Sequence, residues 1–140
     1  MQTILVATDG SPCGQRAEDE GVSLAVATGA RVVFLHVQPE VDPSRSRPGA
    51  LSEETDESHA LLDRALAKAV QVGVEAEAEI VEGNAAREIV DAARLRGADV
   101  IVVGSRGLGK LSGMFLGSVS RDVLSETDRP VLIVKEEKSS

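Results

Sequence analysis

GSRGLGKLSGMFLGS, residues 104–118, is the most informative segment of the chain, because it carries five glycines between a strand pattern and a helix pattern. The residues before it, 100–103, read VIVV and have the length and β-branched content of a buried strand. The residues that follow, 118–124, have the pattern of a helix with Ser118 as its hydroxyl cap. Glycine weakens any element that contains it, so the cluster indicates backbone that turns tightly or approaches another group closely. Such a segment is either a plain surface loop or a place where backbone N–H groups and a helix start bind an anion, usually a phosphate.

The composition of the 140-residue chain, 42% hydrophobic and 27% charged, is that of a soluble globular protein, and we expect one domain over residues 1–140. The net charge of −8 argues against a nucleic-acid partner, and two Phe without Trp or Tyr offer no stacking platform for bases. A single cysteine, Cys13, excludes an internal disulfide and a cysteine-cluster metal site. No apolar run approaches the ~18 residues of a membrane span, and no signal peptide precedes the first strand pattern. We therefore expect a cytoplasmic protein with no membrane partner.

Strand and helix patterns alternate along the chain. The expected strands are residues 3–7, 31–37, 74–81, 99–103 and 131–134. Four helical patterns lie between them, begun by Ser11-Pro12, Ser52, Asn84 and Ser118. The first, third and fourth end near Gly29, Gly97 and Thr127. The expected buried stripe of the second is Leu62, Ala65, Leu66, Ala69 and Gly73, and the apolar residues of the third are Ile89, Val90, Ala93 and Leu95. Residues 38–51 contain three prolines and are expected to be a mobile loop, and residues 136–140 a frayed tail.

This strict alternation predicts an α/β fold: an open, parallel, five-stranded, Rossmann-like sheet with helices on both faces. Right-handed crossovers leave chiefly the strand orders 3-2-1-4-5 and 2-1-3-4-5. The third strand pattern, VEAEAEIV at 74–81, alternates apolar and acidic residues and belongs at an edge, which favours 3-2-1-4-5. In that order the first and fourth strands are neighbours, and ligands bind in the crevice at their carboxyl ends. Asp9-Gly10-Ser11 and the glycine-rich segment leave these two strands, so two separate features of the sequence fall in one place.

Three known phosphate-site patterns fit the chain poorly. In a dinucleotide fingerprint, Gly107 and Gly109 would be the first two glycines, but Ser112 stands in place of the third. Residues 104–110 match a P-loop except for its last position, where Leu111 has no hydroxyl for Mg²⁺. A phospho-receiver domain needs an acidic cluster with an aspartate after the third strand, where this chain has only Glu82.

The segment does match G-x2-G-x9-G-[ST], through Gly104, Gly107, Gly117 and Ser118. With this motif the sequence resembles the universal stress protein family, in particular its ATP-binding branch. The resemblance covers nearly the whole chain: it includes VATDGS at 6–11, LHV at 35–37, GADVIVVG at 97–104 and PVLIV at 130–134.

The resemblance implies an ATP site, with Mg²⁺ accompanying the nucleotide. Asp9 and the backbone around it would lie beside the nucleoside, and the main chain of Val37 would contact adenine. Gly104 and Gly107 would approach the ribose and the α-phosphate. Arg106 and Lys110 either add positive charge to the site or lie on the solvated surface. The full set of expected binding residues is Ala7, Thr8, Asp9, Val37, Gly104, Arg106, Gly107, Gly109 and, for the β- and γ-phosphates, Gly117, Ser118, Val119 and Ser120.

No catalytic residue is predicted. His36 lies at a strand end and is expected to be packed and hydrogen-bonded, while His59 is expected on the exposed side of its helix. No Ser/His/Asp triad or paired carboxylates can be argued from the sequence. Three functions remain open: an ATP-binding stress-response sensor or regulator, a nucleotide-independent dimeric interaction module, and a slow ATPase or phosphotransferase.

The last strand pattern, Val131, Leu132, Ile133 and Val134, predicts a homodimer. In the order 3-2-1-4-5 this strand is an edge, and it contains no charge, bulge or proline that would discourage pairing. Pro130 sits just before it, where a missing donor is tolerated. The family resemblance implies antiparallel pairing of two such strands across a two-fold axis.

Overall fold

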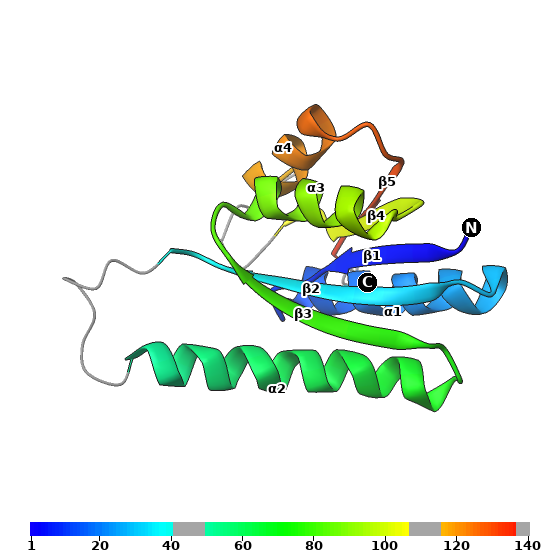
Figure 1. Cartoon of the computed structure of the whole chain (residues 1–140), viewed down its shortest axis with the longest axis horizontal. Helices are drawn as coiled ribbons and strands as arrows, with labels where there is room; N and C mark the ends of the chain where they lie inside the picture. Colours follow the sequence, from blue (N-terminus) through cyan, green and yellow to red (C-terminus); the bar gives the residue numbers. More distant parts are fainter. Residues whose placement is uncertain (41–49, 107–115, 137–140) are drawn as a thin grey trace.

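The computed structural model describes residues 1–40, 50–106 and 116–136, with the backbone alone for 50–54. They form a five-stranded sheet in which every pair of neighbouring strands is parallel and the order is β3-β2-β1-β4-β5 (Figure 1). The elements are β1 (Thr3–Ala7), α1 (Pro12–Thr28), β2 (Arg31–Gln38), α2 (Ala50–Gln71), β3 (Ala76–Glu82), α3 (Ala85–Arg96), β4 (Val100–Gly104), α4 (Ser118–Glu126) and β5 (Val131–Val134). The predicted fold class and strand order are confirmed.

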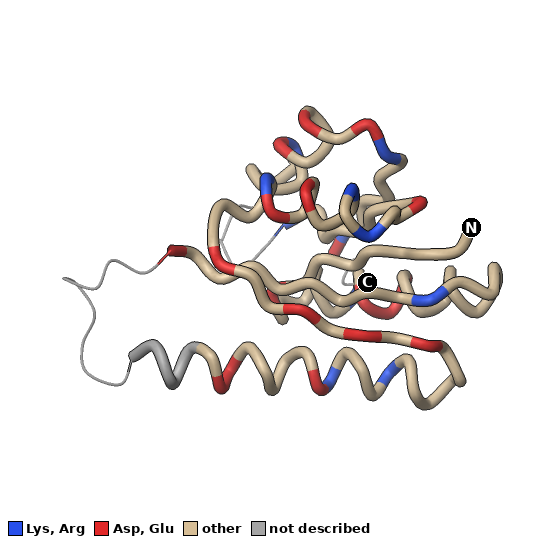
Figure 2. The backbone as a smooth tube through the Cα atoms, in the orientation of Figure 1, with Lys and Arg blue, Asp and Glu red and all other residues tan. Residues whose placement is uncertain are grey.

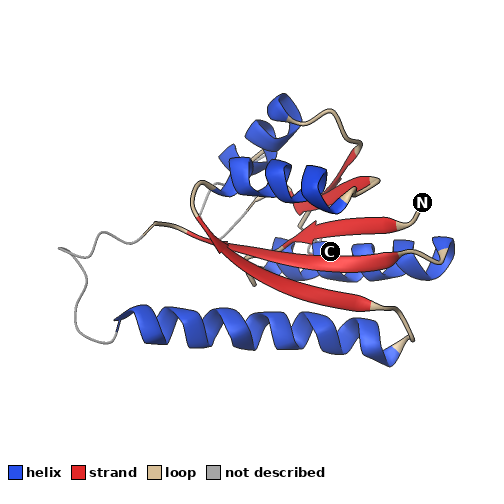
Figure 3. Cartoon of the chain, in the orientation of Figure 1, coloured by secondary structure: helices blue, strands red, loops and turns tan. Residues whose placement is uncertain are grey.

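Helices cover both faces of the sheet (Figure 3). Because successive strand residues point to opposite faces, each central strand contributes side chains to two hydrophobic cores, one on each face of the sheet. Ile4 and Val6 of β1 pack in the core beneath α1 and α2, whereas Leu5 packs in the core beneath α3 and α4. All three side chains have no exposed surface. The strands lack polar alternation at the centre of the sheet because both of their faces are buried.

The predicted starts and ends of α1 and α3 are confirmed by their capping geometry. The Ser11 hydroxyl accepts a hydrogen bond from the Gly14 amide at 3.1 Å, and the Asn84 side chain caps α3 in the same way. Gly29 and Gly97 end these helices in the left-handed conformation, with φ of 75° and 63°.

The predicted start of α2 is wrong. Ser52 was expected to cap this helix, but the helix begins at Ala50, so Ser52 lies inside its first turn. Ala50 and Leu51 are good helix formers, which allows the helix to extend toward the N-terminus. The loop predicted at 38–51 is therefore shorter, because Gln38 belongs to β2 and residues 50 and 51 belong to α2. Its predicted mobility concerns residues 41–49, which lie outside the described residues, as do residues 137–140 of the predicted frayed tail.

The apolar positions of α3 and the predicted stripe of α2 are not buried throughout. Leu95 is 87% exposed, because it lies two positions after the buried Ala93 and thus about 200° around the helix. Gly73 lies beyond the end of α2, whereas Leu62 and Ala65 do form the buried stripe of that helix. His59 is exposed on α2, as predicted. None of the helices among the described residues combines the length and the hydropathy needed to cross a membrane.

β3 is an edge strand, as its alternating sequence predicts. Its alanines and Ile80 pack toward α2, while Glu77 and Glu79, at the alternate positions, point to the other side of the sheet. The acidic residues appear as red segments along this strand in Figure 2. The Arg96 guanidinium binds Glu77 at 2.6 Å and Glu79 at 2.7 Å, and Arg31 also reaches Glu77, at 3.3 Å. These ion pairs put charge on an edge that would otherwise be open to pairing.

Gly21 of α1 allows this helix to approach the sheet closely. A Cβ atom at this position would lie only 2.4 Å from Cγ2 of the buried Val6. We expect Gly21→Ala to lower the free energy of unfolding by about 1–2 kcal/mol, since overpacking outweighs the gain in helix propensity. In a Val6→Ala background the same substitution should cost little or become stabilising, which urea unfolding of all four proteins would measure as a coupling energy. Additive effects of the two substitutions would contradict this account.

Candidate functional site

A cavity of about 360 Å³ lies at the carboxyl ends of β1, β2 and β4, within the size range of small-molecule sites. This is the crevice predicted from the strand order, where the chain leaves β1 in one direction and β4 in the other. Ten of the twelve predicted binding residues line it, and the other two, Gly107 and Gly109, lie outside the described residues, as does Lys110. The ten are Ala7, Thr8, Asp9, Val37, Gly104, Arg106, Gly117, Ser118, Val119 and Ser120.

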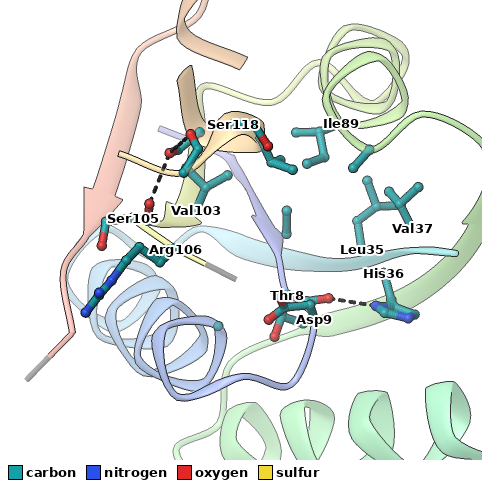
Figure 4. A pocket seen from close by; sticks show the side chains of 17 residues that line it. Thr8, Asp9, Leu35, His36, Val37, Ile89, Val103, Ser105, Arg106 and Ser118 are labelled. Atoms are coloured by element: carbon teal, nitrogen blue, oxygen red, sulfur yellow. Dashed lines mark hydrogen bonds between the residues drawn. The ribbon is translucent and has the colours of Figure 1, made fainter. Parts of the chain in front are cut away.

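On the apolar side of this cavity, sequence reasoning predicted Val37 but missed Leu35, Ile89 and Val103. Leu35, Val37 and Ile89 gather on one side, facing Val103, while the polar residues lie around the rest (Figure 4). Such a surface suits a flat apolar group such as a base. Apolar residues in a helix or strand have the same pattern whether they line a pocket or a core, so nothing in the sequence distinguished them. The other lining residues that were not predicted are Gly14, His36, Ala85 and Ser105.

The turn after β1 is held by a dense set of hydrogen bonds. The Thr8 amide donates to the Leu35 carbonyl at 2.9 Å, and the Thr8 carbonyl accepts from Nδ1 of His36 at 2.9 Å (Figure 4). A bond to a carbonyl requires the His36 proton to be on Nδ1. His36 is therefore packed and hydrogen-bonded, as predicted. The half-buried Asp9 accepts from the Ser11 amide at 2.9 Å through Oδ1, and no second donor to its carboxylate exists among the described residues.

The start of α4 differs from its prediction. Ser118 was expected to be the hydroxyl cap, but the N-cap is Gly117, and no side chain caps the helix. The Gly117 amide donates to the Ser105 carbonyl at 2.7 Å. The one hydrogen of the buried Ser120 hydroxyl is shared between this carbonyl, at 3.2 Å, and the Gly117 carbonyl, at 3.0 Å. These bonds join the two ends of the glycine-rich segment at one point beside the cavity.

The first amides of α4 point away from the helix body and have no acceptor within it. The exposed Ser118 and Val119, at positions N1 and N2, both line the cavity. No hydrogen bond from their amides reaches another residue in the described parts of the chain. With the positive end of the helix dipole, these groups could bind an anion.

Close packing in the protein itself requires Gly104 and leaves little room for a side chain at Gly117. A Cβ at Gly104 would lie 2.8 Å from Cβ of Cys13 in α1. At Gly117 it would lie 3.2 Å from the Ser105 carbonyl oxygen. Cys13 is buried in the first turn of α1 and its sulfur lies 3.8 Å from the Ser105 hydroxyl. The two glycines therefore bring α1 and α4 against the end of β4, whatever else they contact.

Among the described residues that line the cavity, Arg106 is the one lysine or arginine. Its guanidinium forms an ion pair with Glu136, just after β5. The Arg16 side chain of α1 donates to the carbonyl of the neighbouring Lys135. Arg106 thus lies beside the cavity, one of the two places that the sequence left open for it, and a carboxylate of the protein is bound to its guanidinium.

These features define the class of the protein. It is a doubly wound, Rossmann-like α/β protein with a ligand-sized cavity at the topological switch point of its sheet. The chain belongs to the universal stress protein family, whose model matches residues 1–135. The resemblance to this family is thus confirmed, whereas membership of its ATP-binding branch stays a prediction.

Three comparisons illustrate the similarity. Universal stress protein YxiE of Bacillus subtilis (strain 168) is 38% identical over 144 residues, which cover 94% of this chain and 97% of YxiE. The structure of the protein MJ0577 of Methanocaldococcus jannaschii matches with a TM-score of 0.90 at 28% identity. The match covers 99% of this chain and 98% of the MJ0577 chain. A universal stress protein in complex with cAMP has a TM-score of 0.78 at 29% identity and covers 97% and 98% of the two chains. A structural relative therefore binds an adenine nucleotide.

Ser120 and Ser118 differ in what their hydroxyls contact, and this predicts different effects on stability. Ser120→Ala removes a buried donor that joins Ser105 and Gly117, so we expect it to lower the free energy of unfolding by about 1 kcal/mol. Ser118→Ala is the matched control, because this hydroxyl is exposed and caps nothing. Urea unfolding of both variants would measure the difference. Equal stabilities would mean that the Ser120 hydroxyl does not hold the ends of the segment together.

Proposed function

We propose that this protein binds ATP, or another adenine nucleotide, in the cavity at the carboxyl ends of β1 and β4, and acts as a nucleotide-dependent regulator or sensor in a stress response. One observation carries the proposal: a single cavity has an apolar side suited to a base and, elsewhere on its wall, the amides of a helix start suited to phosphate. The cAMP complex of a structural relative supports adenine as the base.

The contacts required for such binding are available. A micromolar dissociation constant corresponds to about −8 kcal/mol, and a hydrogen bond to a charged group contributes roughly 1.5–3 kcal/mol. Four or five contacts to the phosphates are therefore sufficient. These contacts can come from the first amides of α4, the Ser118 hydroxyl and the Arg106 guanidinium. To bind a phosphate, the Arg106 guanidinium would break its ion pair with Glu136.

The Asp9 carboxylate in the cavity must contact a part of the nucleotide other than the phosphates. A carboxylate next to a triphosphate would repel it, so Asp9 accepts hydrogen bonds from the ribose or adenine, or helps to hold Mg²⁺ through water. The main chain of Val37, at the end of β2, lies on the apolar side and is suited to contact the base. Gly104 and Gly117 bring backbone close to the sugar and phosphates.

Isothermal titration calorimetry with ATP, ADP, AMP and cAMP, each with and without Mg²⁺, tests this proposal. We expect a dissociation constant on the order of micromolar for at least ATP. Absence of binding for the whole panel would overturn the proposal and favour a nucleotide-independent interaction module. Steady release of phosphate from ATP would instead favour a slow ATPase.

Asp9→Asn tests the acidic side chain without disturbing its turn, because the amide oxygen still accepts from the Ser11 amide. We expect about a tenfold loss of affinity, of equal size for AMP and ATP, if the carboxylate binds the nucleoside. A loss confined to Mg·ATP would assign Asp9 to the metal instead. Asp122→Asn, at an exposed position of α4, is the control and should change neither affinity. Unchanged affinity in the Asp9 variant would mean that Asp9 only stabilises the turn after β1 and does not contact the nucleotide.

We also propose that β5 forms a homodimer interface. β5 ends the sheet order, and its Leu132 side chain is 38% exposed. The Pro130 carbonyl accepts a hydrogen bond from the Ile101 amide of β4 at 3.0 Å, and the Val134 carbonyl accepts one from the Ser105 amide just after β4 at 2.8 Å. Because backbone groups of alternate residues point to opposite sides of a strand, those of Val131 and Ile133 face outward and are available to a second copy.

Ile133→Pro should therefore give monomers that keep the fold, because it removes a donor that faces away from β4. Leu132→Pro is the contrasting variant, since it removes a donor on the β4 side and should destabilise the sheet. Light scattering and far-UV circular dichroism at tens of micromolar would separate the two effects. An unmodified protein that is monomeric at this concentration would overturn the dimer.

A further inference from the structure

Glu18 of α1 is a buried carboxylate that the proposed nucleotide contacts do not use. The residue is 2% exposed, although acidic residues are rarely buried unless they are paired. Its two oxygens have different partners: Oε2 accepts from the Thr8 hydroxyl at 2.5 Å, and Oε1 accepts from Nζ of Lys68 at 2.9 Å. Glu18 thus joins β1, α1 and α2 at one buried point.

Thr8 is the member of this network that lines the cavity. Its hydroxyl donates to Glu18 and accepts from the Gly10 amide at 3.2 Å. Because the hydroxyl hydrogen points at Glu18, its oxygen lone pairs face the Gly10 amide, so the two bonds depend on each other. α1 also approaches this turn closely, since a Cβ at Gly14 would lie 2.9 Å from the Thr8 hydroxyl oxygen and 2.7 Å from Oδ1 of Asp9. The positions of Asp9 and the Thr8 backbone therefore depend on how Glu18 holds the Thr8 hydroxyl.

Lys68 supplies the positive charge for the buried carboxylate. Its ammonium comes from α2, fifty residues away, and also binds the exposed Asp19 at 3.0 Å. Partial burial lowers the pKa of Lys68, but the hydrogen bonds to Glu18 and Asp19 and the attraction of both carboxylates outweigh it and leave that pKa raised. Lys68 is therefore charged at neutral pH, and a charged Glu18 is satisfied by one ammonium and one hydroxyl.

We propose that Glu18 and Lys68 are positioning residues of the nucleotide site: α2 provides the charge that keeps Glu18 oriented, and Glu18 holds Thr8 and Asp9 where they meet the nucleoside. This inference rests on the proposed function. It predicts that the affinity of the site depends on an ion pair between α1 and α2 that does not touch the nucleotide.

Asp19 provides a matched control. It follows Glu18 in α1 and binds the same ammonium, but its side chain is 63% exposed and no hydrogen bond joins it to Thr8 among the described residues. If the network only fastened α1 to α2, the loss of either carboxylate would have the same kind of effect. If the network positions the site, only the loss of Glu18 should lower the affinity for the nucleotide.

The experiment compares Glu18→Gln, Lys68→Met, Lys68→Arg and Asp19→Asn by calorimetry with adenosine, AMP and ATP. A glutamine has one carbonyl oxygen for two donors, so either Lys68 or Thr8 loses its acceptor. We expect Glu18→Gln and Lys68→Met to weaken binding about tenfold, by the same factor for all three ligands, because the nucleoside contacts are affected and the phosphate contacts are not. Lys68→Arg and Asp19→Asn should remain within about twofold of the unmodified protein.

Amide hydrogen exchange without nucleotide separates this inference from the proposed function. Gly10 and Ser11 amides, which donate to Thr8 and Asp9, should exchange faster in Glu18→Gln and Lys68→Met and normally in Asp19→Asn. If the unmodified protein bound no nucleotide, the proposed function would fail, and unchanged exchange at Gly10 and Ser11 would separately refute the positioning. Equal affinity losses in Glu18→Gln and Asp19→Asn, or a loss that grows with the number of phosphates, would also overturn it. If Glu18→Gln does not fold, the Lys68→Met and Lys68→Arg pair gives the same answer.

Discussion

The structure depends on the parallel pairing of β1 with β4 at the centre of the sheet. Right-handed crossovers carry the chain from β1 toward β2 and from β4 toward β5, so the connections leave these neighbouring strands in opposite directions. The crevice between them cannot be covered by a crossover, and the cavity lies there. The turn that contains Asp9 and the paired ends of the glycine-rich segment, Ser105 and Gly117, reach it from its two sides. The geometry of the candidate site is thus a consequence of strand order.

Close approach of α1 to the sheet is the second constraint. The chain has almost no aromatic residues, so the core is built from Val, Ile, Leu and Ala with Phe34 as its largest fully buried side chain. Small side chains fill such a core only when the helices lie close to the strands. Three glycine contacts bring α1 to β1 and β4: Gly21 against Val6, Gly14 against the turn after β1, and Gly104 against Cys13. The same closeness shapes the rim of the cavity.

Buried polar groups link this packing to the site. Thr8, Glu18 and Lys68 connect the cavity to α2, and Ser120 connects α4 to the end of β4. In a low-dielectric interior such bonds are costly to leave unmade, so they specify one arrangement of the surrounding backbone. In a universal stress protein with this arrangement, occupancy of the cavity and the position of α2 are expected to influence each other through Glu18.

The ten predicted residues that line the cavity were identified through the family resemblance. Local sequence patterns were sufficient for the order of strands and helices, the caps at Ser11 and Asn84 and the edge position of β3, because periodicity, capping and glycine content are properties of neighbouring residues. They were not sufficient for three other features. Ser118 has the chemistry of a cap, yet Gly117 caps α4, since the Ser105 carbonyl binds its amide. Leu35 and Ile89 have the pattern of core residues, and only the crevice leaves them facing a cavity. The partners of Glu18 are ten and fifty residues away, so its burial and its ion pair exist only once β1, α1 and α2 have packed together.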